Sequence, residues 1–290
     1  MIILQSLLLV FATVATARTP KPVCGVRGRT NPSGGTLRIV GGTDAMPLEF
    51  PWLVSLRLST TPNVVSTHFC GGSIINEKYV ITAAHCIFPQ FPSPDDYVVI
   101  VGEFNLTGKD PNEGRFPVKN ITIHPLYNFT TLNYDYALLE LKTPLDFKGS
   151  EKALMPICLP ARNQGFDGQT CTAAGWGYTR DESESGASLS PSLRKVDLPI
   201  IRYTVCKRYY KTVRPVRRNT MICAGPKEGG KSTCEGDSGG PLQCARKDGR
   251  YVLAGSTSWG ETCGAPREPS VFARTSTQLD WIRKIAGVTP

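Results

Sequence analysis

An all-β fold is predicted by three features of this 290-residue sequence. Its 28 glycines and 23 prolines indicate many turns and few long helices. Short runs rich in β-branched and aromatic residues alternate with turns, at residues 52–58, 79–83, 97–101, 137–141 and 251–258. Hydrophobic residues make up 40% of the chain and charged residues 20%, which is typical of a globular protein. Near the C-terminus, Leu279, Ile282 and Ile285 follow the Thr-Ser-Thr of residues 275–277, which suits a helix cap and predicts one amphipathic helix.

The N-terminus is predicted to be a signal peptide covering residues 1–17. Residues 1–10 are largely apolar, and Ala15-Thr16-Ala17 has the small-x-small pattern of a cleavage site. The alternative, a membrane anchor, is disfavoured because the apolar run is shorter than the ~20 residues that span a bilayer. Ten cysteines follow, an even number that in an exported chain indicates disulfides. Three glycosylation sequons agree with export, at Asn105, Asn120 and Asn128.

The net charge of +9 does not by itself predict a nucleic-acid or membrane partner. Residues 18–38 contain five basic side chains and no acidic one, and they are rich in Pro and Gly without periodicity. We interpret them as a flexible leader. A second basic cluster, Arg214, Arg217 and Arg218, is interpreted as a solvated loop. Residues 181–192, rich in Ser, Asp, Glu and Gly, are expected to form an exposed loop.

Three short segments contain the residue types that nucleophilic catalysis requires. They are TAAHC at residues 82–86, DYALL at 135–139 and GDSGGP at 236–241. With these segments the chain resembles the chymotrypsin-like serine protease family, from about residue 38 to residue 286. The resemblance implies two six-stranded antiparallel β-barrels with a site between them and a C-terminal helix. It also implies a peptidase domain over residues 39–290, which hydrolyses peptide bonds in proteins or peptides.

The catalytic residues implied by the resemblance are His85, Asp135 and Ser238. A serine hydroxyl is a weak nucleophile at neutral pH and needs a base within hydrogen-bond distance. His85 would accept its proton and return it to the leaving amine, while a buried Asp135 would orient the imidazole. The backbone N–H groups of Gly236 and Ser238 would form the oxyanion hole, in which loss of one donor typically costs about 3–4 kcal/mol. His68 is expected to support this site, and His124 to be structural.

The resemblance also implies an inactive precursor. Cleavage after Arg38, at the end of an activation peptide covering residues 18–38, would free the α-amino group of Ile39. This group would insert and pair with the carboxylate of Asp237, next to Ser238. Because an unpaired buried carboxylate is costly, the pairing would order the oxyanion hole.

The resemblance proposes a partner for every cysteine, whereas the patterning of the sequence leaves the pairing open. It joins Cys24–Cys158, Cys70–Cys86, Cys171–Cys244, Cys206–Cys223 and Cys234–Cys263. The first of these bonds would keep the leader attached after cleavage, giving a monomer of two disulfide-linked chains. Zinc-binding cysteines are the alternative, but the sequence contains no CxxC pair.

The primary specificity is predicted to be for large apolar or aromatic residues. By resemblance the pocket is formed by Ser232, Ser258, Trp259, Gly260 and Ser270. Ser232 would lie at the floor and has no charge, so a buried substrate Lys or Arg would be left unpaired. An elastase-like preference for smaller residues is the second interpretation. A separate trypsin-like protease is therefore expected to cleave after Arg38, and Glu235 is expected at the rim.

No cofactor is expected to be required. A structural calcium ion is a weaker hypothesis, because Glu103, Asp110 and Glu113 resemble the calcium loop of some relatives, and carboxylates suit Ca²⁺. The expected location is extracellular, and protein inhibitors are expected partners. Two rival functions remain: a non-catalytic binding homologue of the same fold, and a basic surface-binding protein suggested by charge alone.

Overall fold

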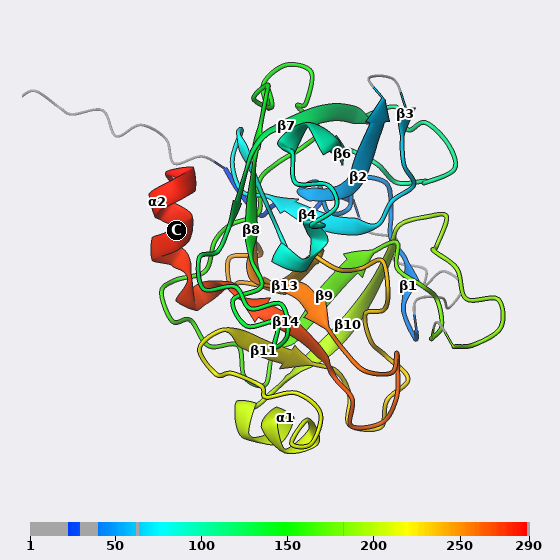
Figure 1. Ribbon diagram of the computed structural model, residues 1–290, viewed down its shortest axis with the longest axis vertical. Helices are drawn as coiled ribbons and strands as arrows, with labels where there is room; N and C mark the ends of the chain where they lie inside the picture. The colour runs from blue at the N-terminus through cyan, green and yellow to red at the C-terminus, as the bar shows by residue number, and fades with distance from the viewer. Residues whose placement is uncertain (1–22, 30–39, 62–63, 182, 289–290) are drawn as a thin grey trace, which may run out of the picture.

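Two closed six-stranded antiparallel barrels form the body of the protein in a computed structural model that describes residues 23–29, 40–61, 64–181 and 183–288 (Figure 1). In the first barrel the strand order is β2-β4-β5-β8-β7-β6, and pairing of β6 with β2 closes it. A short strand, β3, extends β2 at the edge. The strands are β2 (Leu53–Thr61), β3 (Val64–Val65), β4 (Cys70–Ile74), β5 (Tyr79–Thr82), β6 (Tyr97–Val101), β7 (Gly114–Ile123) and β8 (Ala137–Leu141).

The second barrel follows in the chain and has the order β10-β11-β14-β13-β12-β9, closed by pairing of β9 with β10. Strand β1 pairs with Arg194 and Lys195, the first two residues of β10. These strands are β1 (Thr43–Asp44), β9 (Thr170–Gly175), β10 (Arg194–Ile201), β11 (Met221–Ala224), β12 (Pro241–Ala245), β13 (Tyr251–Trp259) and β14 (Ser270–Arg274). The two barrels confirm the fold class expected from the resemblance.

Helices lie at the periphery of the barrels (Figure 1). Helix α1 (Tyr203–Tyr209) lies at one end of the second barrel, and α2 (Leu279–Ala286) confirms the expected C-terminal helix. The expected cap is wrong, because Thr275–Thr277 form a separate 3-10 turn and the helix begins after Gln278 without a side-chain cap. Among the described residues, no helix has the length and apolar character needed to cross a bilayer.

The barrel interiors are filled by the inward-facing side chains of the strands. Along β10, buried and more exposed residues alternate, as expected when one face of a strand points into a core. All five residues of β6 are buried, which explains its continuous apolar sequence. The apolar runs at 97–101 and 137–141 in the sequence coincide with β6 and β8. These strands are almost entirely buried, which is why their residues are mostly apolar.

The leader segment 23–29 lies against the second barrel and is held by more than a disulfide. The Cys24–Cys158 bond is reinforced by hydrogen bonds from Gly25 N to Pro156 O (2.9 Å) and from Tyr251 N to Gly25 O (2.7 Å). These bonds continue the backbone pairing around β13 and fix the segment in one register.

Arg27 is the main side-chain anchor of this segment. Its guanidinium carbon lies 5.1 Å from the centre of the Phe50 ring and 5.6 Å from that of Tyr251. Its Nε donates to the carboxylate of Glu49 at 3.0 Å. Glu49 is fully buried and also accepts a hydrogen bond from Lys195 Nζ at 2.6 Å. Two cations therefore neutralise this carboxylate and attach the leader to β10.

The ten cysteines form five disulfides, and none is free. The pairs are the same as those that the resemblance implies: Cys24–Cys158, Cys70–Cys86, Cys171–Cys244, Cys206–Cys223 and Cys234–Cys263.

Tyr136, directly before β8, connects the two barrels. Its ring is fully buried, and its hydroxyl group lies 3.0 Å from Thr220 O and 2.8 Å from Arg274 O, both in the second barrel. Burial keeps the phenol protonated by raising its pKa well above its ordinary value. The hydroxyl can therefore act as a shared donor to two carbonyl groups across the junction.

Tyr136→Phe is expected to lower the free energy of unfolding by about 1–2 kcal/mol, because it removes this donor without removing the ring. Thermal unfolding of the full chain should show a decrease of about 2–8 °C. Tyr209→Phe is the matched control, because Tyr209 is half-exposed and its hydroxyl bonds to no described residue. Equal melting temperatures for the two variants would contradict a role for this junction in stability.

Candidate active site

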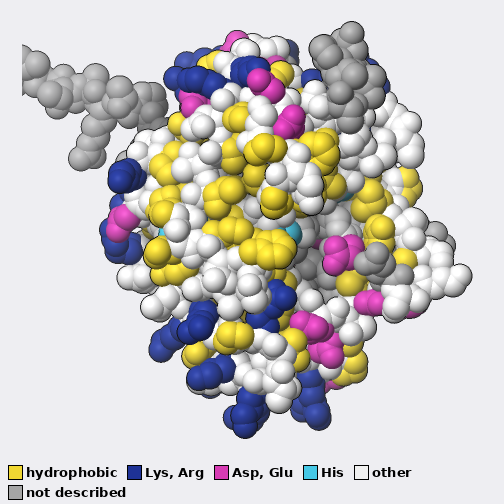
Figure 2. All heavy atoms as spheres, in the orientation of Figure 1, with side chains coloured by type: hydrophobic (Ala, Val, Ile, Leu, Met, Phe, Trp, Pro, Cys, Tyr) yellow, Lys and Arg dark blue, Asp and Glu magenta, His cyan; other side chains and the backbone are white. Residues whose placement is uncertain are grey.

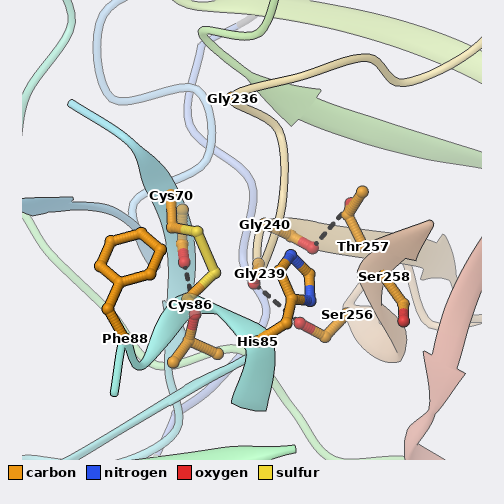
Figure 3. The surroundings of a disulfide bond; sticks show 12 residues. Cys70, His85, Cys86, Phe88, Gly236, Gly239, Gly240, Ser256, Thr257 and Ser258 are labelled. Atoms are coloured by element: carbon orange, nitrogen blue, oxygen red, sulfur yellow. Dashed lines mark hydrogen bonds between the residues drawn. A yellow bond between two sulfur atoms is a disulfide. The ribbon is translucent and has the colours of Figure 1, made fainter. Parts of the chain in front are cut away.

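His85 and Asp135 form a hydrogen-bonded pair in the first barrel. His85 lies in a 3-10 turn (Ala84–Cys86) directly after β5, and the Cys70–Cys86 disulfide ties this turn to β4. Its Nδ1 lies 2.7 Å from Asp135 Oδ2, and its backbone N–H donates to Asp135 Oδ1 at 2.9 Å. Figure 3 shows the imidazole between the disulfide and residues Ser256–Ser258 of β13. Both oxygens of Asp135 are thus used to orient one histidine.

The surroundings of this pair favour a charged imidazole. Asp135 is 1% exposed and also accepts a hydrogen bond from Ser258 Oγ at 2.6 Å. Burial works to lower the pKa of His85, but the negative charge of Asp135 and its hydrogen bond outweigh burial, so the pKa is raised. Ser258 was expected only in the specificity pocket. Its bond to Asp135 joins residues 123 positions apart, so no local sequence signal could have revealed it.

Ser238 lines the same cavity as His85. The cavity has a volume of about 250 Å³ and opens between the two barrels. The carbonyl oxygen of Ser238 accepts a hydrogen bond from Gly71 N at 2.7 Å, which ties its turn to β4. A hydroxyl group, an imidazole and a buried carboxylate therefore share one site, which is the set that nucleophilic acyl transfer requires.

Gly236 is at a position that only glycine fits. Its φ is 90°, and a Cβ atom would lie 2.5 Å from Leu189 Cδ2. Its carbonyl oxygen lies 2.8 Å from His68 Nε2, while His68 Nδ1 lies 2.9 Å from Ser55 Oγ. Burial lowers the pKa of His68 to about 4, so the ring is neutral and can donate to Gly236. His68 thus positions the peptide group that precedes Asp237, in agreement with its expected supporting role.

The Asp237 carboxylate is buried and is held by backbone amides. Gly177 N donates to Oδ1 at 2.8 Å and Cys234 N donates to Oδ2 at 3.0 Å. Burial raises the pKa of Asp237 to about 6, because these two donors compensate the lost hydration only in part. Arg38 and Ile39, expected to take part in activation, lie outside the described residues.

The predicted specificity residues surround the deep part of the cavity. Ser232 is 2% exposed, and its Oγ has no hydrogen-bond partner among the described residues. Ser270 Oγ accepts a hydrogen bond from Thr233 N at 3.0 Å. At the mouth, nothing lies within 4 Å of where a Cβ of Gly260 would be, so access is open. The structure brings all five predicted pocket residues, Ser232, Ser258, Trp259, Gly260 and Ser270, into one cavity.

Carboxylates lie at the rim of this cavity and not at its floor. Glu235, Glu261 and Glu268 line it, and Glu235 and Glu261 continue into an adjoining depression with Asp181. Figure 2 shows acidic side chains gathered beside a central band of hydrophobic ones on this face. Sequence reasoning placed Glu235 at the rim but missed the other two carboxylates, which come from the loop after β13.

Two of the three carboxylates in the suggested calcium loop already have partners within the protein. Arg57 Nη2 pairs with Glu103 Oε1, so a guanidinium group occupies the position next to this carboxylate. Asp110 Oδ2 accepts hydrogen bonds from the backbone N–H groups of Phe104 (2.7 Å) and Asn105 (2.8 Å). Burial raises the pKa of Glu103 to about 7 even though Arg57 opposes the shift. One oxygen of Glu103 and one of Asp110 are therefore used within the protein, while Glu103 Oε2 has no hydrogen-bond partner among the described residues, so calcium binding stays a prediction.

Other predicted positions lie away from the cavity. His124 stacks on Tyr134, with ring centres 4.6 Å apart, and packs against Trp281, in agreement with its expected structural role. Of the three sequon asparagines, Asn120 and Asn128 are exposed and Asn105 is half-buried.

Comparison with known proteins agrees with the fold and the motifs. A family model described as Trypsin matches residues 39–282. The chain is 39% identical over 275 residues to the serine protease filzig of Drosophila melanogaster, covering 93% of this chain and 15% of that protein. It is 37% identical over 249 residues to transmembrane protease serine 9 of Rattus norvegicus, covering 86% and 22%. The chain thus spans less than a quarter of the length of either relative, and it belongs to the trypsin family of serine proteases.

Proposed function

We propose that the protein is a serine endopeptidase in which Ser238 attacks the peptide carbonyl and His85 accepts its proton. The observation that carries this proposal is the hydrogen bond of 2.7 Å between His85 and the buried Asp135 beside Ser238. Asp135 holds the imidazole so that its other nitrogen is free to act as the base. The N–H groups of Gly236 and Ser238 would stabilise the oxyanion. A non-catalytic homologue would have no need of this arrangement.

Large apolar or aromatic residues are the proposed substrates at the cleaved bond. The uncharged floor at Ser232 supports this, because a substrate cation buried there would lack a partner. The alternative is an elastase-like preference for smaller residues. It rests on the side chain of Ser270, which would narrow the cavity at a position where many family members have glycine.

The precursor is proposed to be activated by a separate trypsin-like protease that cleaves after Arg38. Asp237 supports this step. Glu49 and Glu103, also buried, are paired with basic side chains and Asp135 is paired with His85, whereas Asp237 pairs with no basic side chain among the described residues. The new ammonium group of Ile39 would supply its counter-ion. Cys24–Cys158 and the Arg27–Glu49 pair would retain the leader, giving a two-chain monomer.

Secretion and glycosylation are part of the same proposal. Five disulfides are typical of proteins that fold in an oxidising compartment, and a signal peptide at residues 1–17 would direct the chain there. The exposed Asn120 and Asn128 would be accessible to glycosylation. Protein inhibitors that insert a loop into the cavity are the expected regulators.

A peptide-library profile after trypsin activation and trypsin removal tests the function. Cleavage after Phe, Tyr or Leu is expected, and Ser238→Ala should abolish it.

Ser232→Asp should shift cleavage toward Arg and Lys, because it supplies the missing counter-charge. On a gel, the leader should separate from the activated enzyme only after reduction and denaturation. Absence of cleavage by correctly processed protein would favour the non-catalytic homologue, and cleavage after Arg by the unmodified enzyme would overturn the specificity.

The pH profile of kcat/KM is expected to be bell-shaped. Its acid limb should have a midpoint above the ordinary histidine pKa of 6.5, because the Asp135 charge raises the pKa of His85 and the protonated ring cannot act as a base. Its alkaline limb should follow deprotonation of the Ile39 amine, above about pH 8. Asp135→Asn should lower kcat by about 10⁴-fold. Activity that stays flat to pH 11, or an acid midpoint below 6.5, would contradict these assignments.

Calcium is expected to leave the stability unchanged. In a Ser238→Ala background, which prevents self-digestion, melting temperatures with millimolar calcium and with EDTA should agree within about 1 °C. Arg57→Gln should lower the melting temperature by about 5–15 °C, because it leaves a buried carboxylate without its partner. Arg115→Gln, an exposed arginine of the same region, is the control. Stabilisation of the unmodified protein by calcium would show that the loop binds the ion after all.

A further inference from the structure

Arg214 differs from the solvated basic residue that the sequence suggests. It follows helix α1, is half-buried, and lines the cavity together with His85 and Ser238. Its guanidinium carbon lies 5.2 Å from the centre of the Trp259 ring. The stacking fixes the position of the cation on the wall of the cavity.

The guanidinium has hydrogen-bonding capacity that the protein does not use. Nη1 is buried and has no hydrogen-bond partner, and Arg214 forms no ion pair within the described part of the chain. Glu235, Glu261 and Glu268 line the same cavity, but none lies within 4.0 Å of it. A guanidinium group that lines a cavity without an ion-pair partner among the described residues is a position where a ligand carboxylate gains the most.

The direction of a bound substrate follows from the open edge of β13. Strand β12 pairs with β13 only as far as Ser256, and the backbone groups of Thr257 bond to Gly239 and Gly240, which leaves the residues after Thr257 available to an added strand. Gly239 N donates to Thr257 O at 2.8 Å, so Ser238 lies beside the start of this open edge and Trp259 lies further along it. The named strands of these barrels all pair antiparallel, and a substrate added to β13 in the same way runs from Gly260 toward Ser256 in its N-to-C direction. The residues that pass Trp259 therefore precede the cleaved bond.

Building on the proposed protease function, we infer that Arg214 selects substrates with an acidic residue two to four positions before the cleaved bond. A carboxylate matches the planar fork of a guanidinium group and can accept two hydrogen bonds from it. The apolar face of the substrate residue would lie on Trp259. The acidic side chains of Glu235 and Glu261, which line the same cavity, would repel a misplaced carboxylate and so sharpen the register.

Matched peptides with the same cleaved residue and with Glu, Gln or Lys at the second, third or fourth preceding position test this inference. The activated enzyme is expected to show a kcat/KM about 5–20-fold higher for Glu than for Gln at one of these positions, and less at 0.5 M NaCl. Arg214→Gln should reduce this ratio to about one, and Arg214→Glu should favour Lys. Arg217→Gln, which changes an exposed arginine outside the cavity, should retain the ratio of the unmodified enzyme.

The peptide cleavage rates distinguish failure of the proposed role of Arg214 from failure of the protease function itself. Cleavage of all peptides with equal kcat/KM for Glu and Gln would overturn the role of Arg214 and leave the protease function intact. A Glu preference that survives in Arg214→Gln would also overturn it, because another group would then be responsible. If no peptide is cleaved by the processed enzyme, the protease function fails and this inference fails with it.

Discussion

The buried carboxylate of Asp135 is the constraint on which the site depends. An ionised carboxylate without water is strongly unfavourable unless hydrogen-bond donors surround it. Here the donors come from both barrels: His85 belongs to the first and Ser258 to the second. Tyr136, the next residue, reaches carbonyl groups of the second barrel. The geometry of the candidate site and the packing of the barrels therefore depend on the same two consecutive residues.

Four carboxylates are buried in the described part of the chain, and their partners differ in kind. Glu49 pairs with Arg27 and Lys195, and Glu103 pairs with Arg57. The cations at Glu49 hold the leader, whereas the Arg57 pair leaves Glu103 Oε2 buried without a hydrogen-bond partner among the described residues. Asp135 pairs with a titratable imidazole, which suits a proton-transfer step.

Asp237 is the fourth, and among the described residues its carboxylate accepts hydrogen bonds from backbone amides alone. The raised pKa of its carboxyl group reflects this incomplete compensation. A group that gains a cation only after cleavage can act as a switch, because the free energy of pairing becomes available only then. Its neighbours on either side are the proposed oxyanion donors, Gly236 and Ser238, so ordering Asp237 would order them as well.

Most of the fold and of the candidate site was implied by the resemblance, which rests on three short motif segments, whereas composition and turn pattern only agreed with an all-β fold. The runs that became β6 and β8 are apolar except for Glu140 in β8, whereas β7 was missed because many of its residues are exposed, among them Lys119 and Asn120. Helix α1 was missed because no apolar periodicity marks it. The helix cap was wrong because Thr277 Oγ1 bonds to the carbonyl of Asn219, a contact that only the folded chain provides.

Long-range contacts explain what the sequence could not reveal at the site. The bond from Ser258 to Asp135 joins the two barrels, and the stacking of Arg214 on Trp259 joins residues 45 positions apart in the chain (259 − 214), so neither contact has a local signal. Composition alone made Arg214 look like one of several solvated arginines. Its difference from Arg217, which is exposed, arises from the path of the chain after α1.

The distribution of charge in the cavity bears on both the proposed specificity and the proposed activation. Ser232, the predicted floor, is neutral and buried, whereas Glu235 and Glu261 are exposed and Glu268 is half-buried. A rim carboxylate attracts a basic side chain weakly because water screens the pair, whereas the floor would have to desolvate the cation without a counter-charge. On the proposed mechanism, the enzyme would therefore cleave poorly after its own Arg38. An enzyme with this charge pattern would remain a precursor at high concentration until a protease with an acidic pocket floor acts on it.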